Sequence, residues 1–386
     1  MPALLAGAQG PAAPPARSSE SFPALSAQAA AARDANRLSD ALLLYKKALA
    51  LKPNWAEGWW SVGTIAYDQS LYAEAASAFQ KTVALAPRNG TAHVMLGLSE
   101  FELGHDVLSL KEIEKGESLG LDADEELRHV ALYHQGVLLQ RKEKFQAARE
   151  ILEQLCVQGV HSDEITTALG MTLLRHASKN VAQAGSADAD VATRVGRAEC
   201  LAAEKKFDEA RNSFAAAVTQ YPKYPEIHYA YGLFLVEASD LPAAIDQFKA
   251  EIQDNPADVI SRLQIAAATY KTDSAAGIPF AEDAVKLAPQ QPFGHFLLGL
   301  LRLDLDDYMG AIPELELAEK GLPREAKLYA ALASAYSRAG RKPEAARARA
   351  TFARLNQQTE KAESRQLNGE SGAPRNPLSD SVPIPQ

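Results

Sequence analysis

The sequence predicts an all-α fold in which antiparallel helix pairs stack into an α-solenoid, and three observations lead to this prediction. Proline residues recur at a spacing of 33 or 34 residues along much of the chain. Similar phrases end at several of these prolines, such as "YKKALALKP" (45–53), "FQKTVALAP" (79–87) and "AEDAVKLAP" (281–289). Within each period, apolar residues recur at three- and four-residue steps in two separate runs, a pattern typical of two amphipathic helices.

The period "GWWSVGTIAYDQSLYAEAASAFQKTVALAP" (58–87) shows how one pair is expected to form. Two helices are predicted in it, over about 56–69 and 72–85. Gly63 and Ala75 are small, so the two backbones can approach closely, and Phe79 fills the space beside them. Pro87 ends the second helix, because proline cannot continue it. A glycine inside a helix costs about 1 kcal/mol relative to alanine, so its recurrence indicates a packing requirement.

The same marks recur in other periods at fixed distances before the proline. A small residue stands 24 places before it, alanine twelve places before it and a large residue eight places before it. These positions are Gly63, Gly232 and Gly299; Ala41, Ala75, Ala210, Ala244 and Ala311; and Tyr45, Phe79, Phe214, Phe248 and Leu315.

This pattern resembles the tetratricopeptide repeat, a 34-residue helix pair with Trp, Leu, Gly and Tyr in its first helix and Ala, Phe, Ala and Pro in its second. One period matches through Trp59, Val62, Gly63, Ala75, Phe79 and Pro87, with Tyr67 one place late and Thr82 replacing the second alanine. The last clear period carries Tyr329, Leu332, Ala333, Tyr336 and Ala345. The resemblance covers roughly residues 24–357 and implies a right-handed solenoid of about nine to ten repeats.

The periodicity is interrupted in the middle of the chain. A helix-like run at 163–177 has no clear partner, and the following segment, 178–190, is polar and rich in small residues, as loops are. Helix pairing is therefore expected to break there. The predicted organisation is a disordered leader or signal-peptide remnant at 1–23, repeat blocks at 24–177 and 191–357, a linker loop at 178–190 and a disordered tail at 363–386.

Composition and motifs exclude several functional classes. The 386 residues carry a net charge of -9 and no Lys/Arg run, so a nucleic-acid partner is not expected. No apolar run approaches the length of a membrane-spanning helix. Phosphate loops, serine elbows and metal-type histidine spacings are absent from the sequence, so we expect no catalytic residue, metal or cofactor, and no enzyme. Cys156 and Cys200 match no metal or redox spacing, and we expect both to be small buried apolar side chains.

Three histidines, His93, His228 and His295, occupy the same phrase in three periods. They stand where the resemblance places the first-helix Trp, so we interpret them as packing residues rather than as a shared metal site.

In the tetratricopeptide family, the first helices line a concave groove through the fifth, ninth and twelfth places of each repeat. These places hold mostly apolar and aromatic residues here: Trp60, Thr64, Tyr67, Val94, Leu98, Phe101, Tyr133, Val137, Tyr229, Leu233, Phe296 and Leu300. The Lys and Asn residues with which some family members grip a C-terminal carboxylate are missing at such places. Either these side chains are buried against neighbouring helices, or they form an apolar groove for a partner's helix or extended peptide.

The leading functional hypothesis is therefore a non-catalytic protein-interaction scaffold with a protein or peptide partner. A second hypothesis is an exported envelope assembly or maturation factor, because "ALLAGAQ" near the start resembles the end of a signal peptide that lacks its basic region. Localisation is then exported or periplasmic, and otherwise cytoplasmic. A third hypothesis is a regulatory region similar to the repeats attached to glycosyltransferases, without the catalytic domain. The partner and the oligomeric state stay open.

Overall fold

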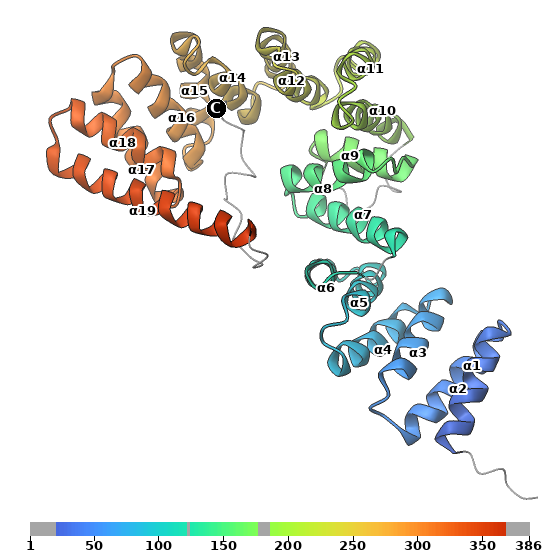
Figure 1. The fold of residues 1–386 in the computed structure, drawn as a ribbon. Helices are drawn as coiled ribbons and strands as arrows, with labels where there is room; N and C mark the ends of the chain where they lie inside the picture. Colours follow the sequence, from blue (N-terminus) through green and yellow to red (C-terminus); the bar gives the residue numbers. More distant parts are fainter. Residues whose placement is uncertain (1–20, 122–123, 177–185, 368–386) are drawn as a thin grey trace, which may run out of the picture. The chain divides into compact units, whose positions relative to one another are not determined.

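The computed structural model describes residues 21–121, 124–176 and 186–367, in which there are nineteen α-helices and no strand (Figure 1). The chain divides into two compact units between residues 122 and 123. The first unit contains α1 (Phe22–Asp34), α2 (Leu38–Leu51), α3 (Ala56–Asp68), α4 (Tyr72–Leu85), α5 (Gly90–Glu102) and α6 (Asp106–Leu119). The second contains α7 (Glu125–Arg141), α8 (Phe145–Val157), α9 (Asp163–Leu173), α10 (Ser186–Ala203), α11 (Phe207–Gln220), α12 (Ile227–Glu237), α13 (Leu241–Asp254), α14 (Val259–Thr269), α15 (Ser274–Leu287), α16 (Pro292–Asp304), α17 (Tyr308–Gly321), α18 (Ala326–Arg338) and α19 (Lys342–Leu367).

The predicted all-α fold of stacked helix pairs is confirmed. Consecutive helices pack as pairs within each unit, and every pair also packs on the next pair of the same unit. The two helices expected over 56–69 and 72–85 are α3 and α4. Among the described residues, no helix combines the length and the apolar character needed to cross a bilayer.

A small residue and a large one set the distance between the two helices of an ordinary pair, as the sequence indicates. Gly63 of α3 lies under the ring of Phe79 of α4, and a Cβ atom added to Gly63 would lie 2.6 Å from that ring. Gly232 of α12 and Phe248 of α13 repeat the arrangement at 2.5 Å. Both phenylalanine side chains are fully buried, so each fills its gap without leaving a void.

Most first helices end in the same backbone turn. After α3, for example, the Ser70 N–H donates to the Tyr67 carbonyl, the Leu71 N–H donates to the Ala66 carbonyl, and Ser70 has a φ of 59°. This is the double-bonded helix end that requires one residue in the left-handed conformation. After first helices, the left-handed residues with this pair of bonds are Asn36, Ser70, Gly104, Glu143, Arg175, Lys205, Ser239, Asp306 and Gly340, and Gly159 makes the same pair after α8.

The helix-like run at 163–177 forms α9 (Asp163–Leu173), which packs along the following helix, and the alternation of helix pairs shifts by one helix at this point. This helix, α9, ends at the Arg175 turn like a first helix, and it packs along α10. Helix α10 in turn packs on both α9 and α11, so it serves as the partner of one helix and as the first helix of the next pair. Odd-numbered helices come first in each pair before this point, and even-numbered helices come first after it.

Helices α9 and α10 touch through their backbones. A Cβ atom added to Gly170 of α9 would lie 1.7 Å from the Ala192 carbonyl oxygen, and one added to Gly196 of α10 would lie 1.7 Å from the Thr166 carbonyl oxygen. The two helices therefore cross without a large side chain between them, which requires glycine at both positions.

A disulfide between Cys156 of α8 and Cys200 of α10 joins the helices on either side of α9. The two Cα atoms lie 5.2 Å apart, an ordinary separation for such a bridge. Both side chains are buried, as expected, but they form a covalent link that their spacing in the sequence does not indicate.

The predicted division at 178–190 stays a prediction. Residues 178–185 lie outside the described part of the chain, α10 already begins at Ser186, and the compact unit after residue 122 includes helices on both sides of this segment. The predicted leader at 1–23 lies outside the described residues up to residue 20. Helix α19 continues to Leu367, into the segment expected to be a disordered tail, and residues 368–386 are not described.

Candidate functional site

The three recurring histidines occupy equivalent hydrogen-bonding positions in their repeats. The Nε2 atoms of His93, His228 and His295 lie 3.2, 3.1 and 3.0 Å from the carbonyl oxygens of the prolines six residues earlier. Trp59 and Tyr329 make the same contact from equivalent positions through their N–H and O–H groups. The Nδ1 atoms of the histidines meet Glu112, Gln247 and Glu314 of the second helices.

These contacts tie each first helix to the end of the preceding repeat, as expected for packing residues. Within the described residues, no group of three or more His, Cys, Asp or Glu side chains is arranged to hold a metal ion.

The twelve predicted groove residues differ in how accessible they are. Six are partly exposed: Trp60, Thr64, Tyr67, Phe101, Tyr133 and Leu233. The other six are buried: Val94, Leu98, Val137, Tyr229, Phe296 and Leu300. In the first unit, Trp60 packs edge-on against Phe79 with ring centroids 5.4 Å apart, and Tyr67 packs in the same way against Tyr72 at 5.5 Å. These rings therefore combine one packed edge with one accessible edge.

In the second unit, predicted groove residues Tyr229 and Leu233 of α12 line one pocket of about 380 Å³. Val236, one turn further along α12, belongs to the same wall. The facing walls come from α8 and the end of α9, and α14 contributes Ile260 and Gln264. The volume and the mixed apolar and polar lining are typical of a ligand site.

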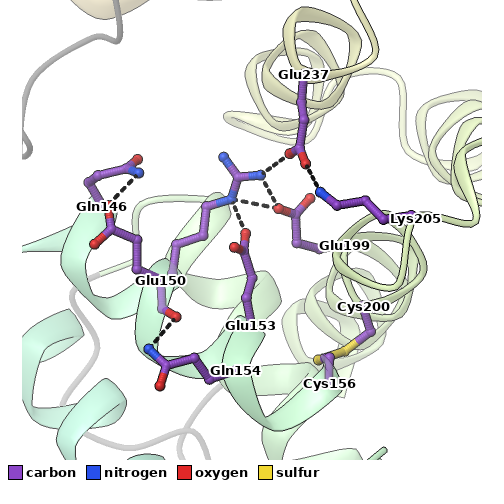
Figure 2. A network of polar contacts seen from close by, with 10 residues as sticks. Gln146, Glu150, Glu153, Gln154, Cys156, Glu199, Cys200, Lys205 and Glu237 are labelled. Carbon is purple, nitrogen blue, oxygen red and sulfur yellow. Dashed lines mark hydrogen bonds and ion pairs between the residues drawn. A yellow bond between two sulfur atoms is a disulfide. The ribbon is translucent and has the colours of Figure 1, made fainter. Parts of the chain in front are cut away.

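Two arginines of this pocket have different surroundings, and Arg149 of α8 is the one that is fully paired. Its guanidinium meets carboxylates from three helices, Glu153 of α8, Glu199 of α10 and Glu237 of α12. Figure 2 labels these three carboxylates. Glu237 also accepts a hydrogen bond of 3.1 Å from the Lys205 ammonium.

Burial shapes the protonation of this cluster, because charged groups lose their hydration inside a protein. It raises the pKa of Glu199 to about 8, although the positive charge of Arg149 acts in the opposite direction. Burial disfavours the charge of Arg149 as well, but Glu199, Glu153 and Glu237 together hold its pKa above the ordinary value. Arg149 therefore stays charged and is neutralised by its own cluster.

The other arginine, Arg175, follows α9 and is partly exposed. Its guanidinium carbon lies 5.2 Å from the centre of the Phe145 ring and 5.7 Å from the centre of the Tyr229 ring. Among the described residues, no carboxylate lies within ion-pair distance of Arg175. The pocket thus holds one cation between two aromatic rings.

Sequence reasoning found the α12 side of this pocket and missed the other side. Arg175 lies in the turn after a first helix, outside the fifth, ninth and twelfth places that were read as groove positions. Phe145 and Arg149 belong to α8, a second helix. A comparison of the turn positions across repeats gives Arg175 as one of three long charged residues, with Glu143 and Lys205, and only the structure places it against Tyr229 of α12.

Comparisons with known proteins bear on the fold. A family model described as the tetratricopeptide repeat matches residues 26–90, 63–107 and 195–259. No curated protein matches the sequence significantly.

Several solved structures are similar to parts or most of the chain. A crystal structure of MamA is 18% identical, covers 42% of this chain and 96% of its own, and has a TM-score of 0.40. The APC/C hetero-tetramer Cut9–Hcn1 is 13% identical over 88% of this chain and 87% of its own, with a TM-score of 0.35. Yeast Tom70 is 14% identical over 90% of this chain and 96% of its own, with a TM-score of 0.30. We draw nothing about partners from similarities of this size.

The family model matches stretches on both sides of the α9–α10 crossing. In these stretches the structure shows consecutive helix pairs with the small, large and proline positions of the motif. Residues 26–107 and 195–259 therefore carry tetratricopeptide repeats.

Proposed function

We propose that this chain is a non-catalytic scaffold that binds a helix or an extended segment of a partner protein on the face formed by its first helices. Tetratricopeptide repeats generally serve protein interaction and do not catalyse reactions, so the fold agrees with the proposal. The observation that carries it is the pocket beside α12, because Leu233 and Val236 are only partly covered by the chain itself there.

The predicted groove residues take two roles in this proposal. Accessible rings such as Trp60 and Tyr67 would contact the partner, because aromatic side chains bury much area at low entropy cost. Buried members such as Leu98 and Phe296 would form the floor beneath it. The proposed site in each unit therefore consists of the partly exposed groove residues of that unit.

A peptide selection on the whole chain tests the proposal without a known partner. Random peptides displayed on phage are selected on the purified protein, and enriched sequences are measured as synthetic peptides. Leu233→Asp is expected to weaken binding at least tenfold, because it places a charge in an apolar wall. Leu317→Asp is the matched control, since Leu317 is exposed on α17 and lines no part of this pocket.

A double variant, Trp60→Ala with Tyr67→Ala, tests the first unit. Peptides that bind there should no longer bind the variant, and its helical circular dichroism signal should stay the same. Loss of helicity would instead assign both rings to the core. If neither Leu233→Asp nor the double variant weakens the binding of any selected peptide, the proposed groove is refuted.

One observation favours the exported alternative. Disulfides persist in oxidising compartments and are rare in the reducing cytosol, and Cys156 and Cys200 are joined. We therefore infer that the scaffold works outside the reducing cytosol. When the protein is taken from its source, unfolded in denaturant and treated with maleimide, no cysteine should react before reduction, and two should react afterwards. Two reactive thiols before reduction would contradict this inference. No observation favours a role beside a glycosyltransferase.

A further inference from the structure

We propose that Arg175 binds a carboxylate of the partner, namely an Asp or Glu side chain within the segment that lies in the α12 pocket. This inference rests on the proposed function and adds the chemistry of the ligand. It is carried by the position of one cation between two rings in a pocket that the chain does not fill.

The two aromatic rings position the guanidinium. Phe145 of α8 and Tyr229 of α12 lie 5.2 and 5.7 Å from its carbon, so the cation is attracted to both rings. One N–H of this guanidinium interacts with the Tyr229 hydroxyl, which leaves the others for further acceptors, and a guanidinium held in this way loses less freedom when a ligand binds. An arginine fork matches the two oxygens of a carboxylate.

The backbone gives no reason for arginine at this position. Arg175 occupies the left-handed turn residue with a φ of 54°; equivalent turns hold short residues at Asn36, Ser70, Gly104 and Asp306 and long charged ones at Glu143 and Lys205. Asparagine and glycine adopt this conformation more readily than arginine does. The turn therefore does not call for arginine, and what distinguishes Arg175 is its contact with the Phe145 and Tyr229 rings.

The charges around the pocket leave Arg175 as its uncompensated cation. Glu237 is already paired with Arg149 and Lys205. Glu143 lines the same pocket, but it is exposed, so water screens its field. Glu226 lies near Arg175, and burial raises the pKa of this carboxyl to about 8, which leaves it mostly protonated at neutral pH.

The size of the pocket favours a side chain inside a longer segment over the end of a chain. Its volume of about 380 Å³ far exceeds that of a carboxylate group, so residues on both sides of the acid can enter with it. Leu233, Val236 and Ile260 supply apolar wall for those neighbours. Gln264 and Gln291 add amide groups that can orient the bound backbone or the acid.

The test uses the phage selection on the full chain, because phage peptides joined to the coat protein at their C-terminus present no free terminal carboxylate. We expect enrichment of Asp or Glu at one fixed place beside apolar residues. In amidated synthetic peptides, a Glu→Gln change at that place should weaken binding to the wild-type protein about tenfold or more. This comparison needs no protein variant and so does not depend on how a variant folds.

Protein variants then locate the contact. Arg175→Asn suits the left-handed turn and should weaken acidic peptides about tenfold, while Arg175→Lys should retain part of the affinity. Arg175→Glu should prefer peptides with Lys at the fixed place over those with Glu. The control is Arg211→Asn, since Arg211 pairs with Asp240 and lies outside the pocket.

The outcomes separate the two proposals. Peptides that depend on Leu233 but show no acidic preference and tolerate Arg175→Asn would overturn the carboxylate site and leave the scaffold function standing. Enrichment of basic peptides would overturn it as well, and would point to Glu143 instead. Acidic peptides that bind only with a free C-terminus would replace the side-chain ligand with a chain terminus. If no selected peptide depends on Leu233 or on the Trp60 and Tyr67 pair, the proposed function itself fails.

Discussion

The α12–α13 pair and the α9–α10 crossing solve the same packing problem with different atoms. In the first, a glycine on one helix faces a phenylalanine on the other, and the ring of Phe248 sets the distance. In the second, Gly170 and Gly196 each face a backbone carbonyl, so the two main chains set the distance. A ring can turn when it is pressed, whereas a carbonyl in a helix can move only with its helix. The crossing should therefore tolerate added volume far less than an ordinary pair.

Adding a side chain at the crossing is the strongest way to separate the two cases. Gly170→Val would place atoms onto the Ala192 carbonyl, and we expect a loss of about 4 kcal/mol or more, at the top of the range for single substitutions. Gly63→Ala meets only the Phe79 ring and should cost about 1–2 kcal/mol, partly offset by the better helix propensity of alanine.

Denaturant unfolding followed by hydrogen exchange measures this difference segment by segment, because repeat arrays do not always unfold in one step. Equal losses for the two variants would show that the crossing relaxes as easily as an ordinary pair.

A disulfide between α8 and α10 is a second feature beside the crossing. Replacing Cys156 and Cys200 by alanine removes a link that spans 44 residues of sequence, and we expect a loss of about 3 kcal/mol, mainly because the unfolded chain gains freedom. Hydrogen exchange should quicken in α8, α9 and α10 before it does in α16–α19. Reduction of the wild-type protein should reproduce the loss, and reduction of the double variant should change nothing. Uniform acceleration along the second unit would contradict a local role.

The charged cluster of α8, α10 and α12 should make stability near the crossing depend on pH. In the unfolded chain Glu199 titrates near its ordinary pKa of 4.5, whereas burial raises its folded pKa to about 8. Between these values the folded protein binds one more proton than the unfolded chain. Its stability therefore falls as pH rises through this window, by about 1 kcal/mol per pH unit, and levels off above about pH 8.

Glu199→Gln keeps a neutral group at this place and should flatten that slope. Denaturant unfolding at pH 5, 7 and 9 compares the variant with the wild type. Identical slopes would mean that Glu199 is ionised in the folded protein across the whole range.

Much of the fold could be predicted from the sequence because ordinary pairs depend on residues that stand out in it. Gly63 and Phe79 mark where the two helices touch, and Pro87 marks the end of the second. Their repeat period predicts the ends of both helices to within a residue or two. The crossing lacks these marks, since a glycine against a backbone needs no large residue opposite it. The sequence therefore indicates α10 only as the start of a repeat and gives no sign that α9 packs along it.

The candidate site was predictable only on one side for a related reason. Tyr229 and Leu233 follow the repeat period, so their place on α12 could be read from the motif. Arg175 meets Tyr229 only because α9 and α12 lie near each other beyond the crossing, and no period in the sequence encodes that contact. Which groove residues stay accessible also depends on neighbouring helices, as the difference between Leu233 and Phe296 shows.

The smallest expected effect comes from replacing two histidines at equivalent positions. His93 belongs to a helix pair of the first unit and His228 to a helix pair of the second. His93 is buried between the Glu112 carboxylate, at 2.7 Å, and the Pro87 carbonyl. His93→Phe would leave Glu112 without its buried hydrogen-bond partner, and we expect a loss of about 2 kcal/mol. His228 makes the equivalent contacts to the Gln247 amide and to a carbonyl, but it is partly exposed, so water can replace them.

His228→Phe should therefore cost about 1 kcal/mol or less. Adding Glu112→Leu to His93→Phe should recover part of the loss, because it removes the stranded carboxylate. Thermal melting of the three variants is sufficient to rank them. Both histidines contact a proline carbonyl, but only His93 meets a buried carboxylate on the second helix. If His228→Phe lowers the melting temperature more than His93→Phe does, the contact with the proline carbonyl contributes more to stability than the contact with the second helix.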